Sequence, residues 1–101
     1  MIPEIKIRPE AEEDLTDAAI WYEEQCVGLG NEFLDRVLST FKSIAAQPGM
    51  YPVVHSRTRR ALMHRFPFGI YYCIESDSIV VLAVMHGSRH PRLWKDRTEP
   101  R

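Results

Sequence analysis

The sequence predicts a two-layer α+β domain with the element order β-α-α-β-β-β, in which a helical hairpin packs on a mostly antiparallel sheet. Two adjacent helical patterns occupy the first half of the chain, and strands rich in aromatic and branched residues occupy the second half. The length of 101 residues suits one domain spanning residues 1–101.

The first half opens with a short strand and a helix. Ile2, Ile5 and Ile7 flank charged residues in a roughly alternating segment, which predicts a strand. Pro9 then begins a helix, because a first turn tolerates proline and the acidic residues that follow favour the positive helix end. One apolar stripe recurs at helical spacing and faces the core, through Leu15, Ala18, Ala19, Tyr22 and Cys26.

A second helix follows the break at Gly28–Gly30, with Asn31 as its expected cap. Its apolar residues hold the helical spacing as far as Gln47, through Phe33, Leu34, Val37, Leu38, Phe41, Ile44 and Ala45. Pro48-Gly49 ends it. So short a connection predicts an antiparallel hairpin of helices.

The second half supplies the sheet. A ragged strand is expected over residues 53–64, followed by a strand from Phe66 to Ile74 and a tight turn over residues 75–78. Residues 79–84 form the most apolar strand, which favours an interior position. Strand alternation directs Arg59 and Arg60 to opposite faces, and we expect one of them to pair with the acidic first helix.

Composition narrows the class of protein. No apolar stretch reaches the roughly 20 residues that a membrane helix needs, and the first residues lack a signal-peptide core, so we expect a cytoplasmic protein without membrane contact. Cys26 and Cys73 are expected to be small buried residues, and the four histidines show no metal-site spacing. We expect neither metal nor cofactor.

Charge is unevenly distributed along the chain. Residues 1–50 contain four basic and ten acidic residues, whereas residues 51–101 contain nine basic and four acidic ones. An acidic face and a basic face are therefore expected on the folded surface.

An ordered set of short motifs runs along nearly the whole chain. It comprises Ala11–Leu15, Trp21–Glu23, Gly28–Gly30 with Phe33-Leu34, Pro48–Pro52, Arg59–Leu62, Arg65–Tyr72 and Val81–Trp94. Together these motifs resemble the ParE/RelE toxin family of bacterial toxin–antitoxin pairs, in its ParE-like, plasmid-stabilisation branch. The family fold agrees with the element order predicted above.

The resemblance implies a small cytoplasmic toxin that a cognate, ParD-like antitoxin holds inactive. ParE-like members are described as poisoning DNA gyrase, whereas RelE-like members cleave messenger RNA on the ribosome. The two activities share one fold, so the site must decide between them. An amphipathic antitoxin helix is expected beside the sheet, at residues Leu15, Tyr22, Phe33 and Val37.

Positive charge and one indole gather after the last apolar strand. The residues expected to bind the target are Arg60, Arg65, His86, Arg89, His90 and Trp94. Trp94 in this basic tail is either a lid over the sheet edge or a recognition anchor.

In the nuclease alternative, Arg65, His86 and Arg89 would supply the base, acid and cations that RNA cleavage without metal requires. RelE-like nucleases commonly carry an arginine where Gly69 stands here, and this departure favours a gyrase-binding toxin. A third alternative is an inactive family member that retains only antitoxin binding.

Overall fold

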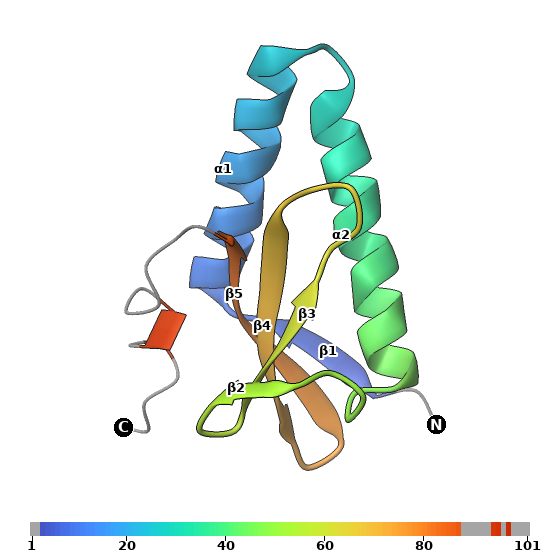
Figure 1. The fold of residues 1–101 in the computed structure, drawn as a ribbon, viewed down its shortest axis with the longest axis vertical. Helices are drawn as coiled ribbons and strands as arrows, with labels where there is room; N and C mark the ends of the chain where they lie inside the picture. The colour runs from blue at the N-terminus through green and yellow to red at the C-terminus, as the bar shows by residue number, and fades with distance from the viewer. Residues whose placement is uncertain (1–2, 88–93, 96, 98–101) are drawn as a thin grey trace.

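The computed structural model describes residues 3–87, 94, 95 and 97. Its helices and strands follow in the order β1 (Glu4–Ile7), α1 (Pro9–Gln25), α2 (Leu29–Ala46), β2 (Val53–His55), β3 (Thr58–Leu62), β4 (Phe68–Glu75) and β5 (Ser78–His86) (Figure 1). Neither helix is long and apolar enough to cross a membrane, within the residues described.

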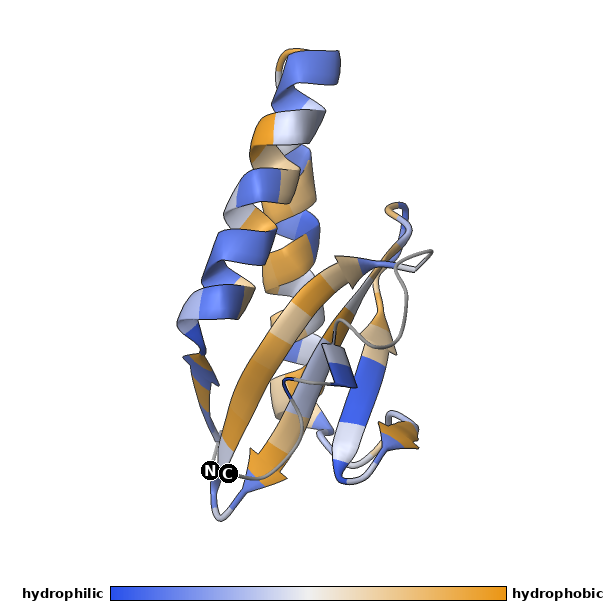
Figure 2. Cartoon of the chain, turned by 90° about the vertical axis from the view of Figure 1, so that its left-hand side faces the viewer, coloured by the Kyte–Doolittle hydropathy of each residue, from blue (hydrophilic) through white to orange (hydrophobic). Residues whose placement is uncertain are grey.

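The five strands form one sheet in the order β1-β5-β4-β3-β2. β1 runs parallel to β5, with Ile5 opposite Ile79, and the remaining neighbours pair antiparallel. Both helices cover one side of this sheet (Figure 2). The predicted two-layer α+β class, the helical hairpin and the interior position of the most apolar strand are therefore confirmed.

The ragged segment over residues 53–64 is two strands rather than one. β2 and β3 are joined by a tight turn in which Ser56 has a φ of 54°. The turn contains neither glycine nor proline, so its position carried no strong sequence signal. The sheet consequently has five strands within the described residues, where four were expected.

The connection between the helices also differs from the prediction. α2 begins at Leu29, two residues before the expected cap Asn31, and Gly28 precedes it with a φ of 92°. The Glu23 carboxylate accepts hydrogen bonds from the backbone N–H of Gly28 at 2.9 Å and of Gly30 at 3.0 Å. A side chain from α1 thus satisfies amide groups at the start of α2. Cys26 follows the last residue of α1 and is exposed, so its predicted burial is wrong.

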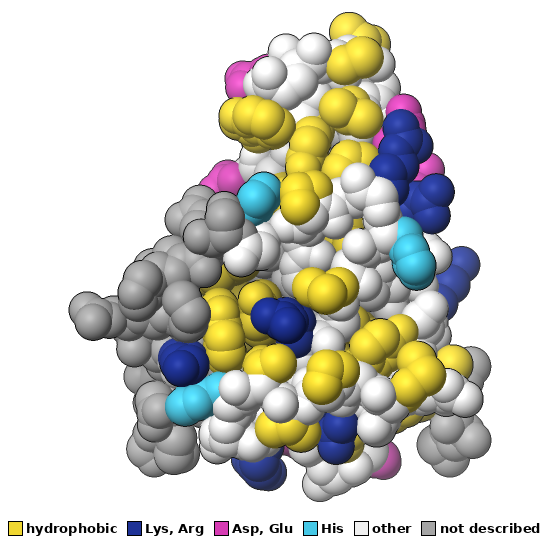
Figure 3. Space-filling view, viewed as in Figure 1, with side chains coloured by type: hydrophobic (Ala, Val, Ile, Leu, Met, Phe, Trp, Pro, Cys, Tyr) yellow, Lys and Arg dark blue, Asp and Glu magenta, His cyan; other side chains and the backbone are white. Residues whose placement is uncertain are grey.

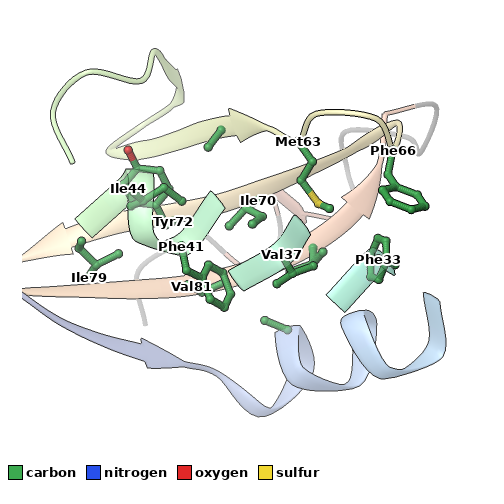
Figure 4. Packing of buried hydrophobic residues seen from close by; sticks show 13 residues of the cluster. Phe33, Val37, Phe41, Ile44, Met63, Phe66, Ile70, Tyr72, Ile79 and Val81 are labelled. Atoms are coloured by element: carbon green, nitrogen blue, oxygen red, sulfur yellow. The ribbon is translucent and has the colours of Figure 1, made fainter. Parts of the chain in front are cut away.

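The main core lies between α2 and the sheet (Figure 4). α2 contributes Phe33, Val37, Phe41 and Ile44 to it. The sheet contributes Ile70, Tyr72, Ile79 and Val81, all fully buried. α1 adds Ala11 as its one buried residue, because the rest of this helix lies at the side of the core.

A bulge in β5 sets which side chains face the helices. Tyr72 lies opposite Val81 and Tyr71 opposite Ala83, so Leu82 has no partner in β4. An extra residue shifts the alternation of all that follow. Val81 and Val84 therefore both pack against the helix-side core, whereas Leu82 and Ala83 both lie on the opposite side, which we call the outer face.

The helical hairpin extends past the end of the sheet (Figure 1). Several large apolar side chains in and beside this hairpin are consequently exposed, namely Ile20, Trp21, Val27 and Leu38.

Candidate functional site

Arg60 lies on the outer face of the sheet. It pairs with Tyr71 of β4, whose side chain belongs to the outer-face cluster. Its side chain extends over the neighbouring Gly69: a Cβ built on that glycine would lie 3.2 Å from Arg60 Cγ and 3.3 Å from Cδ. The arginine stem therefore fills the space that the absent side chain of Gly69 leaves open. RelE-like nucleases are expected to carry an arginine at the position of Gly69 on β4. In this chain the stem of Arg60, from the neighbouring strand β3, lies over that position.

The Arg60 guanidinium contains one buried nitrogen without a hydrogen bond among the described residues. Its Nε is enclosed and has no hydrogen-bond partner in the described part of the chain. Arg59, on the opposite face, donates to the carbonyls of Gly49 at 3.1 Å and Tyr51 at 2.6 Å. The alternation of the two arginines is confirmed. The expected pairing of one of them with α1 is wrong, because Arg59 instead binds backbone oxygens of the segment that follows α2.

Trp94 is a lid. It is 6% exposed and stacks on Tyr71, with ring centroids 4.6 Å apart and planes inclined by 21°. The His55 ring lies 6.1 Å from the indole, and the Lys95 ammonium lies 5.9 Å from the indole centroid. Trp94 and Tyr71 therefore use their ring faces to cover the sheet, and the His55 ring and the Lys95 ammonium lie beside the indole.

Arg65 and His86 lie apart from this group. Arg65 forms an ion pair with Glu32 in the first turn of α2. His86 lies opposite Phe68 in the sheet, with ring centroids 5.4 Å apart, and Phe68 packs against the helix-side core.

The six predicted target residues are therefore not one cluster. Arg60 and Trp94 share the outer face, whereas Arg65 and His86 lie on the other side at the end of the sheet. Arg89 and His90 lie outside the described residues.

The four predicted antitoxin residues divide by burial. Phe33 and Val37 are 0% and 2% exposed, so the sheet already covers them. Leu15 and Tyr22 are half-buried, and Tyr22 packs on Phe33 and Phe66 at 5.3 and 4.9 Å between centroids. Burial raises the pKa of Tyr22, which stays a neutral phenol. The helical spacing of apolar residues could not distinguish those that bind a partner from those that pack against the sheet. The spacing does not reveal where the helical hairpin extends past the sheet.

Cys73 is poorly suited to nucleophilic catalysis. Burial raises the pKa of the Cys73 thiol, and the nearby Glu75 carboxylate raises it further, so this cysteine is not a ready nucleophile. The described residues contain no group of three His, Cys, Asp or Glu side chains that could hold a metal ion.

The outer face carries basic side chains that are surrounded by apolar ones. Figure 3 shows Lys, Arg and His side chains among apolar ones on this face, whereas the acidic side chains lie mainly at the margins of the helices. On the outer side of β3, β4 and β5 the one acidic residue is Glu75, at the far end of β4. Such a surface suits an anionic group more than it suits a second cation.

Comparison with known proteins gives consistent results for family and fold. The family model described as "ParE toxin of type II toxin-antitoxin system, parDE" matches residues 5–91. The solved structure described as "Chromosomal ParDE TA system from P. aeruginosa" is similar to this fold with a TM-score of 0.75. It is 15% identical, and the match covers 84% of this chain and 96% of that one, a likeness that shows the fold alone. No curated protein matches the sequence.

Proposed function

Because the chain belongs to the ParE toxin family of type II toxin–antitoxin systems, we propose that it inhibits DNA gyrase by binding and is neutralised by its cognate antitoxin in the cytoplasm. The family membership makes the chain a ParE-type toxin with an antitoxin partner. The target, neutralisation by the antitoxin and the cytoplasmic location are the proposed parts.

The outer face is the observation that supports a binding toxin. Arg60 lies there beside buried Tyr71 and exposed Leu62, so a cation sits within an apolar, aromatic surface. Arginine and aromatic residues surrounded by apolar contacts are typical of the energetic centre of a protein interface. Inhibition by occupancy of such a surface needs no covalent step by the toxin.

Messenger-RNA cleavage remains the alternative, and the geometry favours it less. Cleavage needs a base, an acid and a cation around one phosphate. Of the three residues expected for cleavage, Arg65 is already paired with Glu32 and the ring of His86 lies against Phe68, and Arg89 lies outside the described residues.

The projecting hairpin is the surface we propose for the antitoxin. Trp21 is more than half exposed there and packs edge-on against half-buried Tyr22. An amphipathic helix could bury its apolar stripe on Trp21 and Tyr22. Ile20 and Leu38 are further apolar residues of the two helices that are more than half exposed. Phe33 and Val37 would support this surface from beneath.

Induction of the chain in cells without antitoxin tests the proposal first. Growth arrest is expected, and harmless expression would identify an inactive family member. Purified protein should then block supercoiling by gyrase or accumulate its cleavage complex. Primer extension on translated messages should show no new ends, whereas codon-phased cuts would identify the nuclease instead.

A further inference from the structure

We propose that Arg60 is the receptor for a carboxylate side chain of the target protein, recessed in the apolar outer face of the sheet. This inference rests on the proposed function, because the partner is the polypeptide of the inhibited enzyme. It adds the chemical group that is recognised and the residue that recognises it.

Gly69 creates the recess. In the sheet, Gly69 lies between Leu62 of β3 and Met85 of β5. These neighbours carry long apolar side chains, and the glycine between them carries none. The Arg60 stem lies in that gap, with Cγ 3.2 Å from the position of a glycine Cβ. The stem of Arg60 thus lies low on the face, and apolar side chains flank it.

Among residues 3–87, 94, 95 and 97, no acidic side chain forms an ion pair with Arg60. Its Nε is enclosed without a hydrogen-bond partner among the described residues. Glu75, the acidic residue on this side of β4, lies four residues beyond Tyr71, roughly 13 Å along the strand at about 3.3 Å per residue. The ion pairs of the described residues join Arg65 to Glu32 and Arg97 to Asp14, so none of them neutralises Arg60. A positive charge without a carboxylate beside it favours an anionic group from a partner.

A carboxylate of a polypeptide fits the apolar surroundings of Arg60 better than the phosphates of a nucleic acid do. Proteins that bind single strands expose ring faces for base stacking and contact many phosphates. Here Tyr71 and Trp94 are 3% and 6% exposed and stack on each other. A single recessed guanidinium with an apolar rim instead matches one acidic side chain within an apolar contact surface.

The shape of the charged group is part of the inference. A guanidinium offers two parallel N–H donors to a carboxylate, whereas an ammonium offers a point charge. Lysine at position 60 should therefore restore little of the binding. Truncation of an arginine at the centre of an interface weakens binding by about 30-fold or more.

The test compares wild type, Arg60→Gln, Arg60→Lys and the control Arg36→Gln for binding to purified gyrase with and without DNA. Arg36 is an exposed arginine of α2, so its replacement changes net charge equally and leaves the outer face intact. We expect wild type and the control to bind DNA-free gyrase alike, and both Arg60 variants to bind about 30-fold more weakly. Unchanged melting temperatures of the variants would show that the loss is not unfolding.

A second measurement is independent of gyrase. The Arg60 Nε–H resonance is followed in the intact protein during titration with sodium acetate, inorganic phosphate and chloride at equal ionic strength. A saturable shift with acetate, absent with chloride and at least as large as that with phosphate, is expected.

The outcomes separate the two proposals. If wild type inhibits gyrase and Arg60→Gln inhibits equally well, the carboxylate receptor is wrong and the proposed function stands. Binding that requires DNA would overturn the carboxylate assignment in favour of phosphate. If wild type has no effect on gyrase, the proposed function fails. The acetate titration then decides alone: no shift, or a larger shift with phosphate, overturns the inference.

Discussion

Asp14 and Arg97 lie 83 positions apart in sequence and meet at the edge of β5, where Arg97 Nη1 is 2.7 Å from Asp14 Oδ2. The same carboxylate oxygen accepts a hydrogen bond from the Val84 N–H at 3.0 Å, and Arg97 also donates to the Leu82 carbonyl at 3.2 Å. β1 pairs only with residues 78–81 of β5. The Asp14–Arg97 pair thus satisfies backbone groups that β1 leaves open, and it shields an unpaired strand edge.

Asp14→Ala should lower the free energy of unfolding by about 1–3 kcal/mol, because it leaves the Val84 N–H without its acceptor and Arg97 without its partner. Urea denaturation measures the loss, and faster hydrogen exchange at the Val84 amide locates it. Glu13→Ala, at the exposed neighbouring position, is the control and should change both little. Unaltered exchange at Val84 in Asp14→Ala would contradict the role given to the pair.

Arg60→Met should keep or raise stability while it abolishes activity. The substitution removes an enclosed Nε that lacks a partner, and methionine fills the same space over Gly69 without a polar group. We expect a gain of up to about 1 kcal/mol in unfolding free energy, with loss of growth arrest on induction. A marked fall in melting temperature would mean that Arg60 has a structural role instead.

Stability should fall between pH 10 and pH 12 in a way that depends on Tyr72. The pKa of Tyr72 is raised to about 12, mainly by burial, and its hydroxyl donates to the Pro48 carbonyl at 2.6 Å. An unfolded tyrosine loses its proton near pH 10, so between these values the unfolded chain binds fewer protons than the folded one. Stability should therefore decline by about 1.4 kcal/mol per pH unit from this residue.

Tyr72→Phe should be less stable at neutral pH by about 1 kcal/mol, because the hydrogen bond to Pro48 is lost. It should also lose the part of the alkaline slope that Tyr72 causes. Denaturant unfolding of both proteins at pH 9 and pH 11 checks this, and parallel pH profiles would refute the assignment.

Gly30→Ala should destabilise the helical hairpin. A Cβ on Gly30 would lie 2.6 Å from the Ala19 carbonyl oxygen, which is backbone of α1 and cannot move without shifting the helix. We expect a loss of about 1–3 kcal/mol in unfolding free energy. Gly49→Ala is the matched control, since its Cβ would meet nothing within 4 Å. Equal melting temperatures for the two variants would show that the helices are not in close contact at Gly30.

Trp21→Ser should weaken neutralisation and leave toxicity intact. Trp21 is 55% exposed on the projecting hairpin, and its ring packs edge-on against Tyr22 at 5.1 Å. Loss of an aromatic anchor should weaken antitoxin binding by about 30-fold, measured by calorimetry with the purified cognate antitoxin. Val53→Ser, which alters an exposed apolar residue of β2, should bind normally. If the antitoxin reverses the growth arrest caused by Trp21→Ser at the same dose as for wild type, Trp21 does not belong to the antitoxin-binding surface.

Local signals account for the parts of the fold that were predicted correctly. The spacing of Phe33, Val37, Phe41 and Ile44 identified the buried stripe of α2, and Pro48-Gly49 marked its end. The β4–β5 hairpin followed from its apolar strands and polar turn. The split between β2 and β3 was missed because Ser56 adopts a left-handed conformation that sequence seldom reveals.

The site was harder to predict because it depends on the β5 bulge. Uninterrupted alternation would place His86 on the same side as Val80 and Leu82, and hence near Arg60 and Trp94. The extra residue at Leu82 returns His86 to the helix side, against Phe68. The pairing of Asp14 with Arg97 was equally inaccessible, since no local pattern relates positions so far apart.

The parallel pairing of β1 with β5 has a consequence for the order in which the protein is made. β1 begins at Glu4 and its partner lies at residues 78–81, so β1 is synthesised well before the strand with which it pairs. Until β5 follows, the sheet that covers the apolar stripe of the two helices is incomplete. Newly synthesised chains should therefore remain harmless, and dependent on chaperones, until β5 has left the ribosome.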